Sequence, residues 1–209
     1  MIGDGMMTKR YIVLTSEFGS GARLLGKCLS EELGLKFYGE DDLLIKAARD
    51  SDIDEKVLRD YDEKLGSIVF DESSQLNGNV LDLDADLPFK IFKAYSSAIF
   101  KTVKEGPCIL MERGADIVLR GKVDFLNVYC YTSDMNKKIE RCMRVSGIAE
   151  KDAPKFIAGQ VMQRKFYYKS FSNIERGKMS EYDLCINTDT FDTDALSMEK
   201  CTEIIKSSL

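Results

Sequence analysis

The chain has 209 residues, enough for one domain with a sizeable core, and its hydrophobic (44%) and charged (31%) shares are ordinary for a globular protein. A formal net charge of −5 argues against general nucleic-acid binding, which needs Lys and Arg to neutralise phosphates. No apolar run approaches the ~20 residues of a membrane span, so we expect neither nucleic acid nor a membrane as partner. Residues 1–8 have no signal-peptide core, so we expect a disordered lead-in and a cytoplasmic protein.

The side-chain inventory restricts the chemistry that this chain can perform. It contains no histidine, which excludes histidine general bases, Ser-His-Asp triads and metal sites built on histidine. Its six cysteines are scattered without a C-x-x-C pair, and several lie inside apolar runs, so we expect buried thiols rather than disulfides or a metal centre. Catalysis would therefore rest on carboxylates, Lys and Arg, backbone amides and bound Mg²⁺.

The first predicted elements are a strand, a glycine-spaced loop and a helix. The strand covers about residues 10–15 and is apolar without alternation, as in a strand buried on both faces of a parallel sheet. Residues 16–21 (SEFGSG) follow, and apolar residues then recur at helical spacing until Gly34. Free N–H groups and the dipole at a helix start attract anions, so this segment predicts a phosphate site. The alternative is a tight strand-to-helix connection without a ligand.

The rest of the chain alternates short apolar strands with helical patterns. Four more strands are predicted, at residues 35–38, 108–111, 125–131 and 184–187. Helices are predicted at residues 43–48, 87–104, 117–121, 134–145, 151–169 and 193–206. Residues 52–65 are only weakly helical, and residues 70–86 indicate a mobile loop rich in Ser, Asn, Gly and Asp. Asp41 and Asp42 either complement the dipole of a helix start or contact an acceptor or a metal.

Strands and helices in this order predict an α/β protein with a parallel sheet covered by helices on both faces. In such a sheet, ligands bind beyond the carboxyl ends of the strands. Four of the five predicted strand ends carry acids and one is rich in glycine; they lie at residues 16–21, 39–42, 112–116, 132–134 and 187–189. We expect these five segments to converge on one cleft.

Three segments together resemble the cytidylate-kinase-like family of P-loop nucleoside-monophosphate kinases. They are residues 15–21 (TSEFGSG) with the helix and GLKFY that follow, residues 109–116 (ILMERGAD) and residues 182–188 (YDLCINT). The resemblance runs from about residue 9 to the C-terminus and is weakest over residues 50–87. It implies a three-layer P-loop NTPase fold in one domain, residues 9–209, with a five-stranded parallel sheet. It also implies a helical acceptor-binding insertion (about 40–105), a helical lid (about 134–172), and ATP and Mg²⁺ as cofactors. Its ligands would be small-molecule nucleotides, and the sequence leaves homo-oligomerisation open.

The resemblance also implies roles for individual residues. The donor triphosphate would lie on the loop and the helix start, at Ser16, Gly19, Ser20, Gly21, Ala22, Arg23, Leu24 and Lys27. Positive charge for the transferred phosphoryl group would come from Arg23, Arg113, Arg141, Arg144 and Arg164. The acceptor would meet Asp41, Asp42, Arg113, Asp116 and Tyr168, and Mg²⁺ would be held by Ser20 and Glu112. The structural alternatives are an ion pair for Arg113, a solvated helix face for Arg141 and Arg144, and lid packing for Tyr168.

Two departures from the family pattern bear on activity. Ala22 stands at the position of the P-loop lysine and is followed by no Ser or Thr for Mg²⁺, so Arg23 or Lys27, with Ser16 or Ser20, would have to substitute. Glu112 stands where relatives more often have glycine, and it either holds Mg²⁺ or pairs with an arginine.

Our leading hypothesis is an ATP-dependent kinase of nucleoside monophosphates, with CMP or dCMP as the favoured acceptor. One alternative is a nucleotide- or anion-binding sensor of the same fold that has lost transfer. The other is a kinase of a different small metabolite, because one fold hosts many acceptors.

Overall fold

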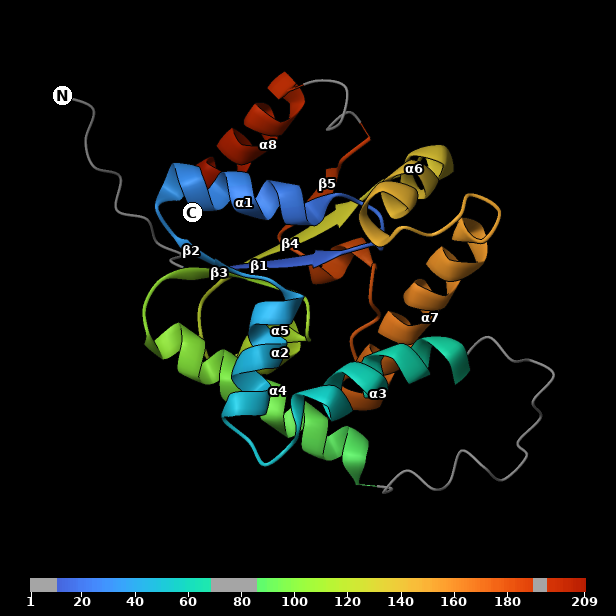
Figure 1. The fold of residues 1–209 in the computed structure, drawn as a ribbon. Helices are drawn as coiled ribbons and strands as arrows, with labels where there is room; N and C mark the ends of the chain where they lie inside the picture. The colour runs from blue at the N-terminus through green and yellow to red at the C-terminus, as the bar shows by residue number, and fades with distance from the viewer. Residues whose placement is uncertain (1–10, 69–85, 190–194) are drawn as a thin grey trace.

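The computed structural model describes residues 11–68, 86–189 and 195–209; the expected lead-in (1–8) and nearly all of the expected loop (70–86) lie outside them. A five-stranded parallel sheet organises the molecule (Figure 1). Its strands are β1 (Tyr11–Ser16), β2 (Lys36–Tyr38), β3 (Cys108–Met111), β4 (Leu126–Tyr131) and β5 (Leu184–Asn187). The order is β2-β3-β1-β4-β5, and every neighbouring pair is parallel, which confirms the predicted α/β fold.

The central strand β1 shows why the sequence pattern lacks alternation. Ile12, Val13 and Leu14 are all fully buried. Ile12 and Leu14 pack in a cluster with residues of α1 (Ala22–Leu33) and α8 (Ala195–Ser207), whereas Val13 packs in a second cluster with residues of α4 (Leu87–Lys104) and α5 (Ala115–Leu119). Because both faces are covered, every position on the strand favours an apolar side chain.

Helices α2, α3 and α4 pack together to one side of the sheet, where α2 spans Glu40–Arg49 and α3 spans Glu55–Ile68 (Figure 1). Leu58 of α3 is fully buried in this cluster, together with Leu44 and Tyr95. The sequence indicated only weak helicity for α3, because its charged residues outnumber the few that reach the cluster. Packing against α2 and α4 thus stabilises a helix whose local sequence is only weakly helical.

The last layer consists of α6 (Met135–Ser146) and α7 (Ala153–Phe171), which stand at the carboxyl end of the strands (Figure 1). Asp134 caps α6 by accepting hydrogen bonds from the backbone N–H groups of Asn136 and Lys137. A short 3-10 helix (Met179–Glu181) lies between α7 and β5.

All six cysteines lie in the described residues and are free thiols. No described helix has both the length and the apolar character that crossing a membrane requires.

Candidate active site

The loop between β1 and α1 combines backbone geometry and free donors in the way an anion site requires. Gly19 and Gly21 have φ angles of 79° and 80°, in the left-handed region that favours glycine. Helix α1 begins directly after Gly21, with no side chain capping it. Within the described part of the chain, the backbone N–H groups of Gly19, Gly21 and Ala22 donate to no protein acceptor. These N–H groups and the positive end of the helix dipole supply the donors and the positive potential that phosphate binding requires.

A cavity of about 450 Å³ adjoins this segment, and we call it the loop cavity. All eight residues expected to hold the donor triphosphate line it: Ser16, Gly19, Ser20, Gly21, Ala22, Arg23, Leu24 and Lys27. Three of the expected arginines line it as well, namely Arg141, Arg144 and Arg164. The structure therefore brings together residues that the sequence could place only one segment at a time.

No lysine reaches the loop from position 22, because that position is a buried alanine. Arg23, the nearest substitute, lies against the start of α2, with Nη2 at 3.7 Å from Glu40 Oε2 and 4.0 Å from Asp41 Oδ2. Lys27 is exposed at the cavity edge. In this structure the charge at the start of α1 is therefore directed toward α2.

Arg141 supports the loop from the side of its carbonyl groups. The side chain is buried, and Nη1 donates to the carbonyl oxygens of Ser20 (3.0 Å) and Gly19 (3.3 Å). Nη2 donates to the carbonyl of Thr188, just past β5, at 2.7 Å. Arg141 thus ties the loop to the end of β5, while Arg144 is exposed on the next turn of α6.

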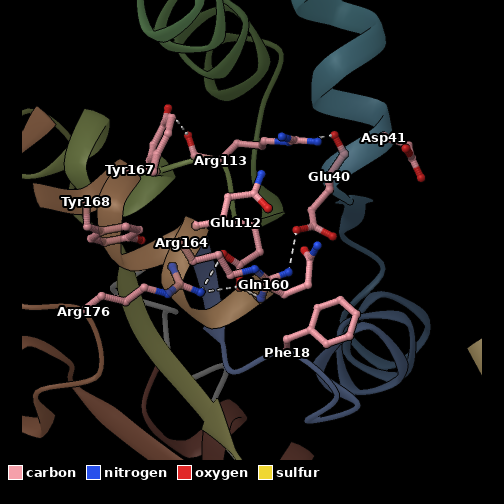
Figure 2. Close-up of a pocket in the computed structure, with 12 residues that line it drawn as sticks. Phe18, Glu40, Asp41, Glu112, Arg113, Gln160, Arg164, Tyr167, Tyr168 and Arg176 are labelled. Atoms are coloured by element: carbon pink, nitrogen blue, oxygen red, sulfur yellow. Dashed lines mark hydrogen bonds and ion pairs between the residues drawn. The ribbon is translucent and has the colours of Figure 1, made fainter. Parts of the chain in front are cut away.

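A second cavity of about 260 Å³ lies next to the first, and Figure 2 shows its lining. It shares Phe18, Glu40 and Arg164 with the loop cavity. Its charged lining consists of three acids and three arginines: Glu40, Asp41, Glu112, Arg113, Arg164 and Arg176. Gln160, Gln163, Tyr167 and Tyr168 add polar groups from α7. The two cavities are therefore neighbours, and Arg164 lies at their junction.

Glu112 is the most heavily bonded charge in the site. Its Oε1 accepts hydrogen bonds from the Ser16 backbone N–H and from Ser16 Oγ, both at 2.8 Å. Arg164 Nη1 donates to the same oxygen at 3.2 Å, and Arg176 Nη2 donates to both carboxylate oxygens at 2.9 Å (Figure 2). Arg164 also pairs with Glu40 through Nη2 at 2.9 Å. The sequence alone leaves open whether Glu112 pairs with an arginine, and the structure shows that it pairs with two.

Burial and charge oppose one another at this cluster. Burial alone raises the pKa of Glu112, but Arg164, Arg176 and the Ser16 hydrogen bond outweigh it and hold that pKa below the usual range. Burial likewise lowers the pKa of Arg176, but the Glu112 carboxylate more than reverses this and raises it. Both groups are therefore charged at neutral pH, which makes the pair a buried ion pair.

Arg113 follows Glu112 at the carboxyl end of β3 and faces the second cavity. Its guanidinium lies over the ring of Tyr95, with Cζ 4.9 Å from the ring centroid, and Nε donates to the backbone carbonyl of Glu40 at 3.4 Å. Stacking fixes the plane of the guanidinium, as expected for a group that presents several donors to one anion.

The remaining predicted acceptor residues divide between the cavity and its surroundings. Asp41 lines the second cavity, whereas Asp42 caps α2, because its Oδ2 accepts from the Gly39 N–H at 2.8 Å. Asp116 is buried behind Tyr168, whose hydroxyl donates to Asp116 Oδ1 at 2.5 Å. Burial raises the pKa of Asp116, although the Tyr168 hydrogen bond and Arg176 act in the opposite direction.

The two residues expected to hold Mg²⁺ differ in whether their oxygens are available to a metal ion. Ser20 Oγ is buried and has no hydrogen-bond partner among the described residues, so it can serve as a ligand. The oxygens of Glu112 are already engaged by Ser16 and two arginines, and therefore do not fit a metal. The described residues also contain no group of three or more His, Cys, Asp or Glu side chains able to hold an ion.

Two charged residues of the site were not singled out from the sequence. Glu40 begins α2 one residue before Asp41 and Asp42, and it lines the second cavity together with Asp41. Arg176 lies in the irregular segment after α7, where no periodicity or motif marks it. Only the tertiary structure brings it to Glu112.

The sheet order and the glycine loop between β1 and α1 define the fold of a P-loop kinase. The chain matches the cytidylate kinase-like family over residues 11–190, and it therefore belongs to that family. Among curated proteins, no sequence match was found.

Solved structures with this fold share little sequence with the chain. An uncharacterized protein from Eubacterium ventriosum is 20% identical with a TM-score of 0.63, and the match covers 95% of this chain and 96% of that one. Shikimate kinase from Acinetobacter baumannii, solved in complex with shikimate, is 13% identical with a TM-score of 0.50, covering 97% and 96%. Deoxyadenosine kinase from M. mycoides with bound dATP has the same identity and TM-score, covering 94% and 99%. At these identities the likeness establishes the fold alone.

Proposed function

We propose that the protein is an ATP-dependent phosphotransferase that moves the γ-phosphoryl group from ATP to a nucleoside monophosphate, with CMP or dCMP as the favoured acceptor. The single observation that carries this proposal is the junction of the two cavities at Arg164. A donor phosphate chain in the loop cavity and an acceptor in the second cavity would meet beside its guanidinium. The family supplies the nucleotide character of the acceptor.

The residues present suit phosphoryl transfer, which needs in-line positioning and positive charge rather than covalent chemistry. In this proposal the free N–H groups of the loop bind the donor phosphates. Arg164 neutralises charge on the transferred group, and Arg113 binds the acceptor phosphate from its position over Tyr95. Neither step requires a histidine.

The other predicted residues would serve the two ends of the same cleft. Arg144 and Lys27 would bind the outer donor phosphates from the edge of the loop cavity. The Arg23 side chain would leave its ion pairs with Glu40 and Asp41 of α2 and join them. Arg141 would hold the loop in shape through its carbonyl groups. Asp41 would meet the acceptor directly, and Asp116 would position Tyr168 beside it.

Mg²⁺ would be held by the Ser20 hydroxyl together with the nucleotide's own phosphate oxygens. When bound, it would supply positive charge to the β- and γ-phosphates. The structure gives Glu112 a different role, as the partner of two arginines.

The test is a coupled assay with ATP, Mg²⁺ and a panel of nucleoside monophosphates, extended to nucleosides and small hydroxylated metabolites. We expect turnover with CMP or dCMP to exceed the rate of ATP hydrolysis without acceptor. Turnover only with an acceptor that is not a nucleotide would contradict this proposal and indicate a kinase of another metabolite.

A nucleotide- or anion-binding protein without transfer is the second candidate, because two observations favour it. Ala22 removes the lysine that usually approaches the donor phosphates, and Glu112 engages both Arg164 and Arg176. This candidate predicts measurable ATP binding by calorimetry with no turnover on any acceptor. The two measurements made on the same preparation distinguish the candidates.

A further inference from the structure

The groups around the Glu112 carboxylate form a set that would bind a phosphoryl group equally well. They comprise one backbone N–H and one hydroxyl from Ser16, and the guanidinium groups of Arg164 and Arg176. Amide, hydroxyl and guanidinium donors bind carboxylates and phosphates through the same charge-assisted hydrogen bonds. Glu112 therefore occupies an oxyanion site assembled from β1, α7 and the segment after α7.

This oxyanion site is within reach of a ligand. Arg164 lines the loop cavity, the second cavity and a third cavity of about 250 Å³, and Arg176 lines the latter two. Arg176 is almost fully buried, with 5% of its side chain exposed, whereas Arg164 is 16% exposed. Because Arg164 lines all three cavities and is the more exposed of the two arginines, an anion entering from any of them would meet Arg164 before Arg176.

The backbone gives no reason for a glutamate at position 112. Glu112 and Arg113 have φ angles of 64° and 56°, in the left-handed region where glycine is favoured. The position would be less strained as glycine, so the side chain is held there by its charge partners.

We propose that Glu112 is an internal counter-ion that occupies an oxyanion site formed by Ser16, Arg164 and Arg176. When a phosphoryl group binds, Arg164 leaves Glu112 and pairs with the phosphoryl group instead. Arg176 keeps its pairing with Glu112 throughout, because it is buried and bonded to both carboxylate oxygens. Arg164 changes partner, because it is shared with Glu40 and lies at the cavity junction. Glu112 is thus a positioning residue that sets the affinity of the site for phosphate.

The test is calorimetric titration of inorganic phosphate into the wild-type protein, Glu112→Gln and Glu203→Gln. Glu203 is an exposed acid on α8 that pairs with Lys206, so its variant removes the same charge away from the cluster. We expect Glu112→Gln to bind phosphate roughly tenfold more tightly than the wild type, because the competing carboxylate is gone. Glu203→Gln should match the wild type. Equal or weaker binding by a folded Glu112→Gln protein would overturn the proposal.

Two further measurements keep the test decisive if Glu112→Gln does not fold. Glu112→Gly removes the carboxylate at a backbone position that suits glycine, and it should show the same gain. In the wild type, the arginine Nε–H signal that Arg164→Lys abolishes should shift during a phosphate titration observed by nitrogen-15 NMR. An unchanged signal at saturating phosphate contradicts the exchange of partners.

The inference rests on the proposed function only for the identity of the anion. Tighter phosphate binding by Glu112→Gln, with no phosphoryl transfer by the wild type, would refute the proposed function and support the inference. Transfer by the wild type without tighter phosphate binding by the variant would refute the inference alone.

Discussion

The loop cavity and the second cavity differ in how their binding groups are used before a ligand arrives. In the loop, the backbone N–H groups of Gly19, Gly21 and Ala22 have no protein acceptor among the described residues. In the second cavity, by contrast, Glu40, Glu112, Arg164 and Arg176 are bonded to one another. An anion can therefore bind the loop without breaking any contact, whereas binding at the second cavity requires an exchange of ion pairs. This difference makes the loop a backbone site and the second cavity a side-chain site, and the two should respond differently to substitution.

The largest effect is expected at Arg164, where the two cavities meet. Arg164→Ala should lower the kcat/KM of phosphoryl transfer by about 10³-fold, because an arginine that neutralises the transferred group contributes on this scale. ATP affinity should change far less, because the loop N–H groups remain. The coupled assay and calorimetry measure the two quantities.

The matched control for Arg164→Ala is Arg120→Ala, which removes an exposed arginine paired with Glu181 away from the cavities. It should leave both quantities unchanged. A loss of ATP affinity in Arg164→Ala as large as the loss of activity would contradict the separation between the two cavities.

The next largest effect is expected on stability, at the buried ion pair. Arg176→Met should lower the free energy of unfolding by about 3 kcal/mol or more, because it leaves the Glu112 carboxylate buried without its main partner. The double variant Glu112→Gln/Arg176→Met should recover much of this loss. Urea denaturation measures both, and a double variant no more stable than Arg176→Met would show that the pairing is not the cause.

The same pair predicts how stability depends on pH. The pKa of Glu112 is lower in the folded protein than its ordinary value of 4.5, so its contribution is complete above that value. The contribution is lost as the pH falls through the lowered pKa. Glu112→Gln should therefore flatten the acid limb of the stability profile below about pH 4.5, and an unchanged limb would contradict the assignment.

An intermediate effect is expected at the loop backbone. Gly21→Ala forces alanine into a φ of 80°, at a cost of about 1–2 kcal/mol, and should weaken ATP binding roughly tenfold by tilting the loop N–H groups. Gly147→Ala at the end of α6 imposes similar strain, with no atom near the added methyl group. It should lose stability without losing ATP affinity. Equal ATP affinity in the two variants would show that the loop does not bind the nucleotide.

The smallest effect is expected at Arg23. Its ion pairs with Glu40 and Asp41 are long, and 42% of its side chain is exposed, so Arg23→Ala should cost less than about 1 kcal/mol of stability. A loss of ATP affinity would indicate that the Arg23 side chain leaves its partners on α2 and contacts the phosphates. A loss above about tenfold, or 1.4 kcal/mol, would show that it replaces the missing lysine.

The sequence predicted the sheet because each strand and its following helix are encoded locally. Residues 11–14 needed only an unbroken apolar run, and the loop needed only its glycine spacing. The loop residues could be named in advance because they are contiguous. Helix α3 was underestimated because its stability depends on contacts with α2 and α4 that the local pattern does not contain.

The second cavity was less predictable for a physical reason. Glu40 and Asp41 line the cavity whereas Asp42 caps α2, and this division depends on α2 beginning at Glu40. Arg176 belongs to an irregular segment, so its partner depends on a contact across 64 residues of sequence. Local patterns fix neither the phase of a helix nor a pairing of this kind.

The most direct test of two cavities joined at Arg164 is calorimetry with a bisubstrate analogue, in which adenosine and cytidine are linked through a phosphate chain. If the loop cavity holds the donor and the second cavity the acceptor, the analogue should bind far more tightly than ATP or CMP alone. Arg164→Ala should lose most of that gain. An analogue that binds no more tightly than ATP would contradict a donor and an acceptor site that meet at this arginine.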